Sequence, residues 1–232
     1  GEKRQKRLCF KCKICDREGL LMAFTYPICL KLAQKKCVVV GAGSVALRKV
    51  KTLLAQEALV TVVSPELNQE LAKEKDKFVW EQAYYREEFL ADAFLVIAAT
   101  DKRAVNHEIA AYCDKHNILV NVIDSPEESS FIVNSYFTKG DLLVAVSTDG
   151  ASPALSRKIR KDLEAQIADE YADILAIIAE ARAEALIKIT DESKRREFLQ
   201  SLAKIDYEAI IKDKSTATFR DRVKKCLLSY LE

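Results

Sequence analysis

The sequence predicts an α/β protein with a doubly wound parallel sheet, followed by a β-hairpin and a small helical domain. Over residues 36–123, short apolar runs alternate with segments of helical periodicity. Strands that are apolar throughout are typical of parallel sheets covered by helices on both faces, and right-handed crossovers make such a sheet doubly wound. Two β-prone runs around Gly140 then predict the hairpin, and only helical patterns follow Ser152.

Five strands and three helices are predicted for the first part, in the order of a Rossmann domain. The strands are Cys37–Val40, Leu59–Val63, Phe78–Gln82, Phe94–Ala98 and Ile118–Ile123. The helices are Ser44–Ala58, Pro65–Lys75 and Lys102–His116. In the first helix Ala46, Val50, Leu53, Leu54 and Ala58 share one face, which predicts packing against the sheet. The pair Ser64-Pro65 is a good N-cap and first-turn combination for the second helix.

The second part begins with the predicted strands Ser129–Phe137 and Leu142–Thr148, joined around Gly140, which can supply the positive φ of a tight turn. An isolated hairpin is marginal in water, so it needs the C-terminal helices or a second subunit, and we expect a homodimer. The helices that follow are Ala154–Ala168, Tyr171–Ile189, Asp191–Ile205 and Thr216–Leu231. The predicted division is a leader over 1–21, a Rossmann domain over 22–124, a hairpin dimerisation segment over 125–150 and a helical domain over 151–232.

Composition and charge exclude several classes of function. The formal net charge of +2 is too small to indicate nucleic-acid binding through bulk electrostatics. No apolar run reaches the roughly 20 residues that cross a bilayer, so no membrane partner is expected. The charged residues 2–7 precede no clean apolar stretch, which argues against a signal peptide and favours a cytoplasmic protein.

Seven cysteines fall into two groups. Cys9, Cys12 and Cys15 form a Cys-x-x-Cys-x-x-Cys run, which could share a zinc ion or an iron-sulfur cluster if a fourth ligand were present. The favoured alternative is a disordered leader ahead of Met22. The remaining cysteines stand among apolar residues and are predicted to be small core groups. They are Cys29, Cys37, Cys113 and Cys226.

A glycine-rich turn joins the first strand to the first helix. Gly41-Ala-Gly43-Ser-Val-Ala46 fits the G-x-G-x-x-G/A fingerprint, with alanine in the last place. Gly41 would allow the tight turn, Gly43 would let a pyrophosphate approach the backbone, and Ser44 and Val45 open the helix whose N–H groups attract phosphate. The alternative is a glycine turn that binds nothing. Its place between a strand and a helix favours dinucleotide binding.

The end of the second strand bears on the choice between NAD and NADP. An acidic residue there binds the ribose hydroxyls, and a basic one accepts a 2′-phosphate. Here the strand runs into Ser64, Pro65 and Glu66, with no Arg or Lys directly after it. We therefore expect these residues to hold the ribose, and we favour NAD.

Polar residues also follow the fourth and fifth strands, where ligands bind in an open parallel sheet. They are Thr100 and Asp101 after one strand, and Asn121 and Asp124 at the other. An aspartate at such an edge can act as a general base or can simply cap the next turn. From spacing alone both interpretations stay open, for Asp124 as for Asp101.

Several blocks of the sequence carry a family resemblance. They are Tyr26-Pro-Ile, Val38-Val-Val-Gly-Ala-Gly-Ser-Val-Ala-Leu-Arg-Lys49, Val60-Thr-Val-Val-Ser-Pro-Glu-Leu67, Val96-Ile-Ala-Ala-Thr-Asp101, Asn121-Val-Ile-Asp124 and Val144-Ala-Val-Ser-Thr-Asp-Gly-Ala-Ser-Pro153. Together, over about residues 22–163, they resemble the precorrin-2 dehydrogenase/ferrochelatase module of sirohaem synthase. Many members have glycine where this chain has Ala42, a free position of the fingerprint.

The resemblance implies an enzyme that oxidises precorrin-2 to sirohydrochlorin and passes hydride to NAD. Some members also insert ferrous iron, which makes them lyases as well as oxidoreductases. The aspartate of the Asn-Val-x-Asp block is the family's catalytic residue and falls on Asp124. Members are intertwined homodimers, in agreement with the hairpin. The alternative from another class is a regulatory module that senses NAD without catalysis, although such modules usually close the second strand with an acidic residue.

A tetrapyrrole carries many carboxylates and asks for cations and backbone donors. The candidate substrate contacts are Asn121, Ser147, Thr148, Ser152 and Arg157, with Ser129 also within possible reach. Segment 152–161 carries four cations, which are Arg157, Lys158, Arg160 and Lys161. The alternative to substrate binding is that they form a solvated helix face paired with Asp162 and Glu164. His107 could guide a metal, but a surface histidine is favoured for it. His116 is the other histidine of the chain.

Overall fold

The computed structural model describes residues 25–213 and 215–231. Residues 25–30 belong to a unit separate from residues 31–232 and contain no helix or strand. The predicted leader, with Cys9, Cys12 and Cys15, lies outside the described residues. The division into domains at 22, 125 and 151 stays a prediction.

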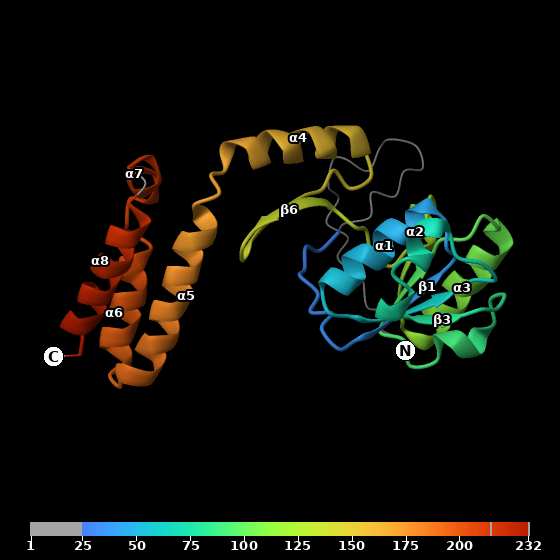
Figure 1. Cartoon of the computed structure of the whole chain (residues 1–232), viewed down its shortest axis with the longest axis horizontal. Coiled ribbons are helices and arrows are strands. Elements are labelled where there is room, and N and C mark those ends of the chain that lie inside the picture. Colours follow the sequence, from blue (N-terminus) through green and yellow to red (C-terminus); the bar gives the residue numbers. More distant parts are fainter. Residues whose placement is uncertain (1–24, 214, 232) are drawn as a thin grey trace, which may run out of the picture. The chain divides into compact units, whose positions relative to one another are not determined.

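Five parallel strands form the sheet of the first part (Figure 1). They are β1 (Lys36–Val40), β2 (Leu59–Val63), β3 (Val79–Glu81), β4 (Leu95–Ala98) and β5 (Leu119–Val122). Their order is β3-β2-β1-β4-β5, so the chain crosses β1 between β3 and β4 and reverses its winding there. Val40, at the end of β1, pairs with Val63 on one side and Ala98 on the other. The predicted doubly wound sheet is confirmed, and a crevice is expected beyond these strand ends.

Two longer helices cover the sheet. Helix α1 (Ser44–Ala55) contacts β1 and β2, and α3 (Arg103–His116) contacts β4 and β5. Right-handed crossovers on the two sides of the reversal place these helices on opposite faces. Alternate residues of β1 serve the two faces, and Val38 and Val40 lie in one buried cluster with Ile109 and Cys113 of α3. Both faces of the sheet are therefore buried, as the apolar strands predict.

The second helix is shorter than predicted. Helix α2 spans Gln69–Ala72 and not Pro65–Lys75, because Asn68 caps it by accepting a hydrogen bond from Leu71 N at 2.8 Å. An asparagine at the N-cap accepts a hydrogen bond from a backbone N–H that has no partner within the helix, so the helix begins after Asn68 and not after the Ser64-Pro65 pair. Residues 64–67 therefore stay free of the helix and follow β2 as a loop.

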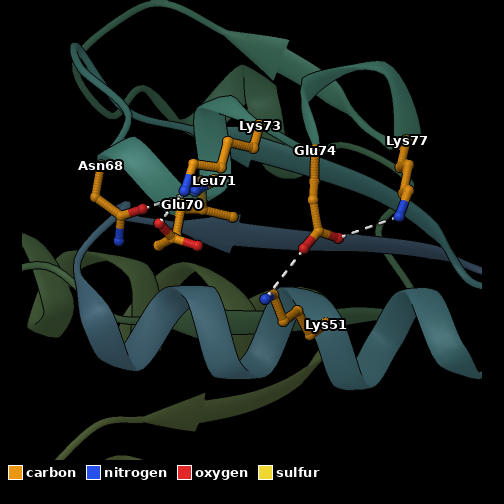
Figure 2. Close-up of polar contacts among 7 residues, drawn as sticks. All are labelled: Lys51, Asn68, Glu70, Leu71, Lys73, Glu74 and Lys77. Carbon is orange, nitrogen blue, oxygen red and sulfur yellow. Dashed lines mark hydrogen bonds and ion pairs between the residues drawn. The ribbon is translucent and has the colours of Figure 1, made fainter.

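One ion pair joins the segment that follows α2 to α1, and a second lies within that segment (Figure 2). Glu74 accepts from Lys51 Nζ of α1 at 3.1 Å and from Lys77 Nζ at 3.5 Å. The hydrogen bond from Lys51 is the main reason why the pKa of Glu74 lies below its ordinary value. Lys77 ends a 3₁₀ helix, η1 (Lys75–Lys77), which leads into the edge strand β3.

The hairpin consists of β6 (Ser135–Lys139) and β7 (Leu142–Val146), which pair antiparallel around Gly140 with φ +56°. The start predicted at Ser129 is wrong. A second 3₁₀ helix, η2 (Glu87–Leu90), precedes β4, and a third, η3 (Pro126–Glu128), follows β5. After η3 the chain runs beside β5. There the hydroxyl oxygens of Ser129 and Ser130 accept from Val122 N and Val120 N at 2.9 and 2.8 Å. These serines thus continue the edge of the sheet through side chains.

Helix α4 (Pro153–Gln166) packs on the hairpin and contacts both of its strands (Figure 1). The remaining helices are α5 (Tyr171–Lys188), α6 (Glu192–Leu202), α7 (Tyr207–Lys212) and α8 (Thr216–Ser229). Phe198 and Phe219 are fully buried between α5, α6 and α8. The sequence patterns missed α7, because its six residues are too few to show a period, although Asp206 caps it through the N–H of Ala209.

The cysteines predicted for the core divide by position. Cys37 in β1 and Cys113 in α3 are fully buried, and burial raises the pKa of each thiol to about 11. Cys226 is half-buried. The prediction is wrong for Cys29, which is exposed and lies before the first strand, in a stretch without helix or strand. Of the helices described, none is long and apolar enough to cross a membrane.

Candidate active site

One cleft of about 900 Å³ lies at the carboxyl ends of the parallel strands. It is lined by the turn after β1, the loop after β2, and the residues that follow β4 and β5. Every candidate cofactor residue and the candidate base line this one cleft. They are Gly41, Gly43, Ser44, Val45, Ser64, Pro65, Glu66, Thr100, Asp101 and Asp124. The structure thus brings together residues that the sequence spreads over more than 80 positions.

The two glycines of the turn are needed for different reasons. Gly41 has φ +108°, and a Cβ built on it would lie 2.3 Å from the carbonyl oxygen of Ala99. Only glycine fits there, because both the backbone angle and the neighbouring chain exclude a side chain. Gly43 has an ordinary φ of −75°, and a Cβ on it would meet nothing within 4 Å. Its missing side chain leaves open space above the turn instead.

The start of α1 fits a phosphate group. Within the described part of the chain, α1 has neither a side chain capping its first turn nor an acidic residue in that turn. The N–H groups of Ser44 and Val45 therefore lack intrahelical partners and lie at the positive end of the helix dipole. Together with the open space at Gly43, these donors form the cradle that a dinucleotide pyrophosphate requires.

The loop after β2 provides a neutral group at the expected ribose position. Ser64 is only 4% exposed, and its hydroxyl and carbonyl oxygens both accept from the indole N–H of Trp80. Pro65 and Glu66 are exposed at the cleft edge. The sequence analysis did not single out Trp80, since nothing local in the sequence relates β3 to a residue 16 positions earlier.

Thr100, after β4, is held by a buried side chain that the sequence analysis also missed. Asn106 in α3 is 7% exposed. Its Oδ1 accepts from Thr100 Oγ1 at 2.7 Å and from Thr100 N at 3.3 Å, and its Nδ2 donates to Thr100 O at 3.1 Å. Asn106 therefore fixes the backbone and the hydroxyl of Thr100 at the floor of the cleft.

We expect Asn106→Leu to lower the free energy of unfolding by about 2 kcal/mol, because the leucine leaves the backbone groups of Thr100 without partners. Urea denaturation followed by far-UV circular dichroism measures the change. The exposed Asn117, which ends α3 with φ +55°, offers a control, since Asn117→Gly keeps its left-handed conformation. Equal midpoints for Asn106→Leu and the wild type would contradict this role for Asn106.

Asp124 stands two residues beyond the end of β5 and lines the cleft. It is exposed and adopts φ +61°, a left-handed conformation that aspartate and asparagine tolerate better than most residues. Within the described residues no hydrogen bond occupies its carboxylate. That leaves the carboxylate free to accept a proton from a ligand in the cleft.

Other residues line the cleft without having been predicted, among them Lys102, Tyr84 and Tyr85. The ammonium group of Lys102 lies 5.2 Å from the ring centre of Tyr84 and gives the wall a cation. Tyr85 packs on the sheet core, and its hydroxyl is buried without a hydrogen-bond partner in the described structure. Desolvation by burial, followed by the charge of Glu87, raises the pKa of Tyr85, so this hydroxyl stays protonated.

The candidate substrate residues lie outside the lining of the cleft. Asn121 donates its amide to Phe131 O at 3.1 Å. Thr148 and Ser152 serve the start of α4, because Thr148 Oγ1 accepts from Ser152 N and Ser152 Oγ accepts from Leu155 N. Ser147 accepts from Asp149 N in the preceding turn. A contact of these residues with substrate stays a prediction, as does that of Arg157.

The cations of α4 divide into two kinds. Lys158 pairs with Asp162 at 2.9 Å, and Arg160 pairs with Glu164, as expected for a solvated helix face. For Arg157 and Lys161, by contrast, no ion pair is found within the residues described. Their charges remain available to an acidic ligand.

His107 is an exposed histidine of α3, as favoured, but it has a partner. Its Nδ1 lies 2.5 Å from Glu128 Oε1, and this contact is the main reason why the pKa of Glu128 is lowered. His116 stacks on Tyr112 at 4.0 Å between ring centres. Over residues 25–213 and 215–231, no group of three or more His, Cys, Asp or Glu side chains is placed to hold a metal ion.

Comparison with known proteins agrees with this geometry. Residues 28–135 match the family described as "Putative NAD(P)-binding", and residues 139–166 match "Sirohaem biosynthesis protein central". Siroheme synthase of Photorhabdus laumondii is 38% identical over 74% of this chain and 37% of its own length. Siroheme synthase of Nitrosospira multiformis is 37% identical over 84% of this chain and 43% of its own length.

The chain thus spans about two fifths of the length of these relatives. Among solved structures, SirC, a precorrin-2 dehydrogenase, is similar with a TM-score of 0.69 and 27% identity. That similarity covers 85% of this chain and the whole of SirC. The chain is therefore similar to siroheme synthases in sequence and to a precorrin-2 dehydrogenase in fold.

Proposed function

We propose that this chain oxidises precorrin-2 to sirohydrochlorin, with NAD as the hydride acceptor. The observation that carries the proposal is the single cleft in which the glycine turn and Asp124 face the same space. A dinucleotide bound on the turn would have its reactive ring near the strand ends that lead to Asp124. The names of the relatives and of the similar structure support the same reaction.

Each group of the cleft has a role in this reaction. The N–H groups of Ser44 and Val45 bind the pyrophosphate, and Ser64 and Glu66 lie at the ribose. Bound NAD supplies the redox chemistry by accepting a hydride from the macrocycle. The substrate then loses one proton as well, and Asp124 takes that proton as general base. The products are sirohydrochlorin, NADH and a proton, so atoms and electrons balance.

A homodimer is part of the proposal. Tyr136 and Leu143 of the hairpin and Leu155 of α4 are exposed apolar side chains, with Leu143 exposed by 49%. Burying them against a second copy would remove apolar surface from water and would give the hairpin its neighbour. Arg157 and Ser147 lie on the same segment, and in a homodimer they would be available to the carboxylates of the tetrapyrrole.

Ferrous iron is a further proposed substrate, inserted into sirohydrochlorin to form sirohaem in the cytoplasm. Metal insertion also requires a base for the pyrrole protons, and Asp124 can serve there too. An anaerobic assay with sirohydrochlorin and ferrous or cobaltous ion tests this step, in the full chain and in a chain that begins at Met22. Formation of the metallated product by both chains is expected, and its absence in both would contradict ferrochelation.

The dehydrogenase proposal is tested by anaerobic incubation of the full chain with precorrin-2 and NAD. We expect the absorbance of sirohydrochlorin and NADH to appear in equal amounts. A module that only senses NAD would bind the dinucleotide and leave the tetrapyrrole unchanged. That outcome would overturn the enzymatic proposal and leave the dinucleotide site intact.

A further inference from the structure

Trp80 reaches from the edge strand β3 to the loop that follows β2. Its Nε1 donates to the carbonyl oxygen of Ser64 at 3.1 Å and to Ser64 Oγ at 3.2 Å. Ser64 N donates in turn to Glu81 O at 3.1 Å. Residues of β3 therefore hold Ser64 at its amide, its carbonyl and its hydroxyl, which leaves this residue little freedom.

The indole ring itself is held from a second side. Lys75 of η1 places its ammonium group 5.2 Å from the centre of the Trp80 ring. The ring is half-buried at the sheet edge. Packing and the cation over its face fix the direction of the N–H, so the donor reaches Ser64 with a defined geometry.

This arrangement determines the role that the Ser64 hydroxyl can play. A serine hydroxyl has one donor hydrogen and two acceptor lone pairs. The Trp80 N–H uses one lone pair, and among the described residues the Ser64 hydroxyl has no acceptor for its own hydrogen. Ser64 lines the cleft, so that hydrogen is available to a ligand oxygen there.

We infer that Trp80 is a positioning residue for dinucleotide binding, which holds the Ser64 hydroxyl so that it donates to the ribose. The inference rests on the proposed function, since it takes NAD as the occupant of the cleft. It assigns to this chain a neutral donor, supported from β3, where an acidic acceptor is usual. The residues that determine ribose binding thus include Trp80, which lies outside the glycine fingerprint.

The test is a double-mutant cycle on NADH binding, measured by isothermal titration calorimetry without tetrapyrrole. Ser64→Ala removes the donor, and Trp80→Phe keeps the ring but removes the N–H. Each variant is expected to raise the Kd for NADH about fivefold, the effect of one hydrogen bond. The double variant should be no worse than Ser64→Ala alone, because Trp80 acts only through Ser64.

A positioning role also predicts how the kinetics divide. In precorrin-2 oxidation, both single variants should raise KM for NAD about fivefold and leave kcat at saturating NAD unchanged. Lys73→Gln is the matched control, because it removes an exposed cation from the same part of the chain that pairs with Glu70 and has no part in the ring contact of Trp80. Its NADH affinity is expected to stay within about twofold of the wild type. Urea midpoints show whether each variant is folded.

The outcomes separate the inference from the proposed function. A wild type that binds no NADH overturns both. Wild-type binding together with multiplied losses in the double variant overturns the inference alone, since Trp80 would then act independently of Ser64. If Trp80→Phe does not fold, Ser64→Ala decides, and an unchanged Kd in that variant overturns the inference. Trp80 is the only tryptophan of the chain, so its emission in the wild type should also change when NAD binds.

Discussion

Replacing Asp124 with asparagine should lower kcat for precorrin-2 oxidation by about 100- to 10,000-fold, the usual contribution of a general base. The carboxylate lies in the cleft. An amide has nearly the same shape but cannot accept the proton, so the substitution removes the base and changes little else. Asp124 is not one of the residues assigned to the pyrophosphate or the ribose, so NADH binding should be unchanged. Single-turnover absorbance gives the first quantity and calorimetry the second.

Asparagine is a better substitution here than alanine, for a structural reason. Asp124 has φ +61°, and alanine would pay a strain there that asparagine largely avoids. Loss of activity in Asp124→Ala would therefore mix lost chemistry with an altered turn. Asp92 is the matched control, because it is also an exposed aspartate with positive φ (+59°) but lies outside the lining of the cleft.

Asp92→Asn should retain wild-type activity. A kcat for Asp124→Asn within a factor of two of the wild type would remove the carboxylate from the mechanism. Reduced NADH binding in Asp124→Asn would give it a role in holding the cofactor instead. Equal losses in the two aspartate variants would point to the turns and not to the carboxylate.

The sheet and the glycine turn could be predicted because their causes are local. A run such as Val38–Val40 is buried on both faces and has to be apolar at every position, so it is visible in the sequence. Gly41 could likewise be predicted, because only glycine suits its φ and its close approach to Ala99, and Gly43 completes the fingerprint of a phosphate-binding turn. The carboxyl ends of parallel strands share one edge, so the sequence order of these motifs already predicts that they meet.

The supporting contacts could not be predicted because their causes are tertiary. Asn106 reaches back to Thr100, and Trp80 reaches across from β3 to Ser64. Neither partner carries a sequence signal, since an asparagine in a helix or a tryptophan in a strand has many other uses. The predicted strand at Ser129 failed for the same reason. Its serine hydroxyls bond to the β5 backbone, and only the folded sheet shows that edge.

Gly41→Ala and Gly43→Ala, the same substitution two positions apart, should fail in opposite ways. At Gly41, φ is +108° and the new methyl group would lie 2.3 Å from Ala99 O, a backbone atom that cannot swing aside. Left-handed strain of about 1–3 kcal/mol is then added to a steric clash. We expect the free energy of unfolding to fall by about 3 kcal/mol or more, measured by urea denaturation.

At Gly43 the new methyl group meets nothing within 4 Å of the protein, and φ is an ordinary −75°. Alanine is a poorer N-cap than glycine, so stability should fall by less than about 1 kcal/mol. The methyl group would, however, stand in the space through which a pyrophosphate reaches the N–H groups of α1, and the Kd for NADH should rise at least about tenfold. A stable Gly43→Ala variant with wild-type NADH affinity would mean that phosphate does not lie over this turn, because glycine is expected there to let the pyrophosphate approach the backbone.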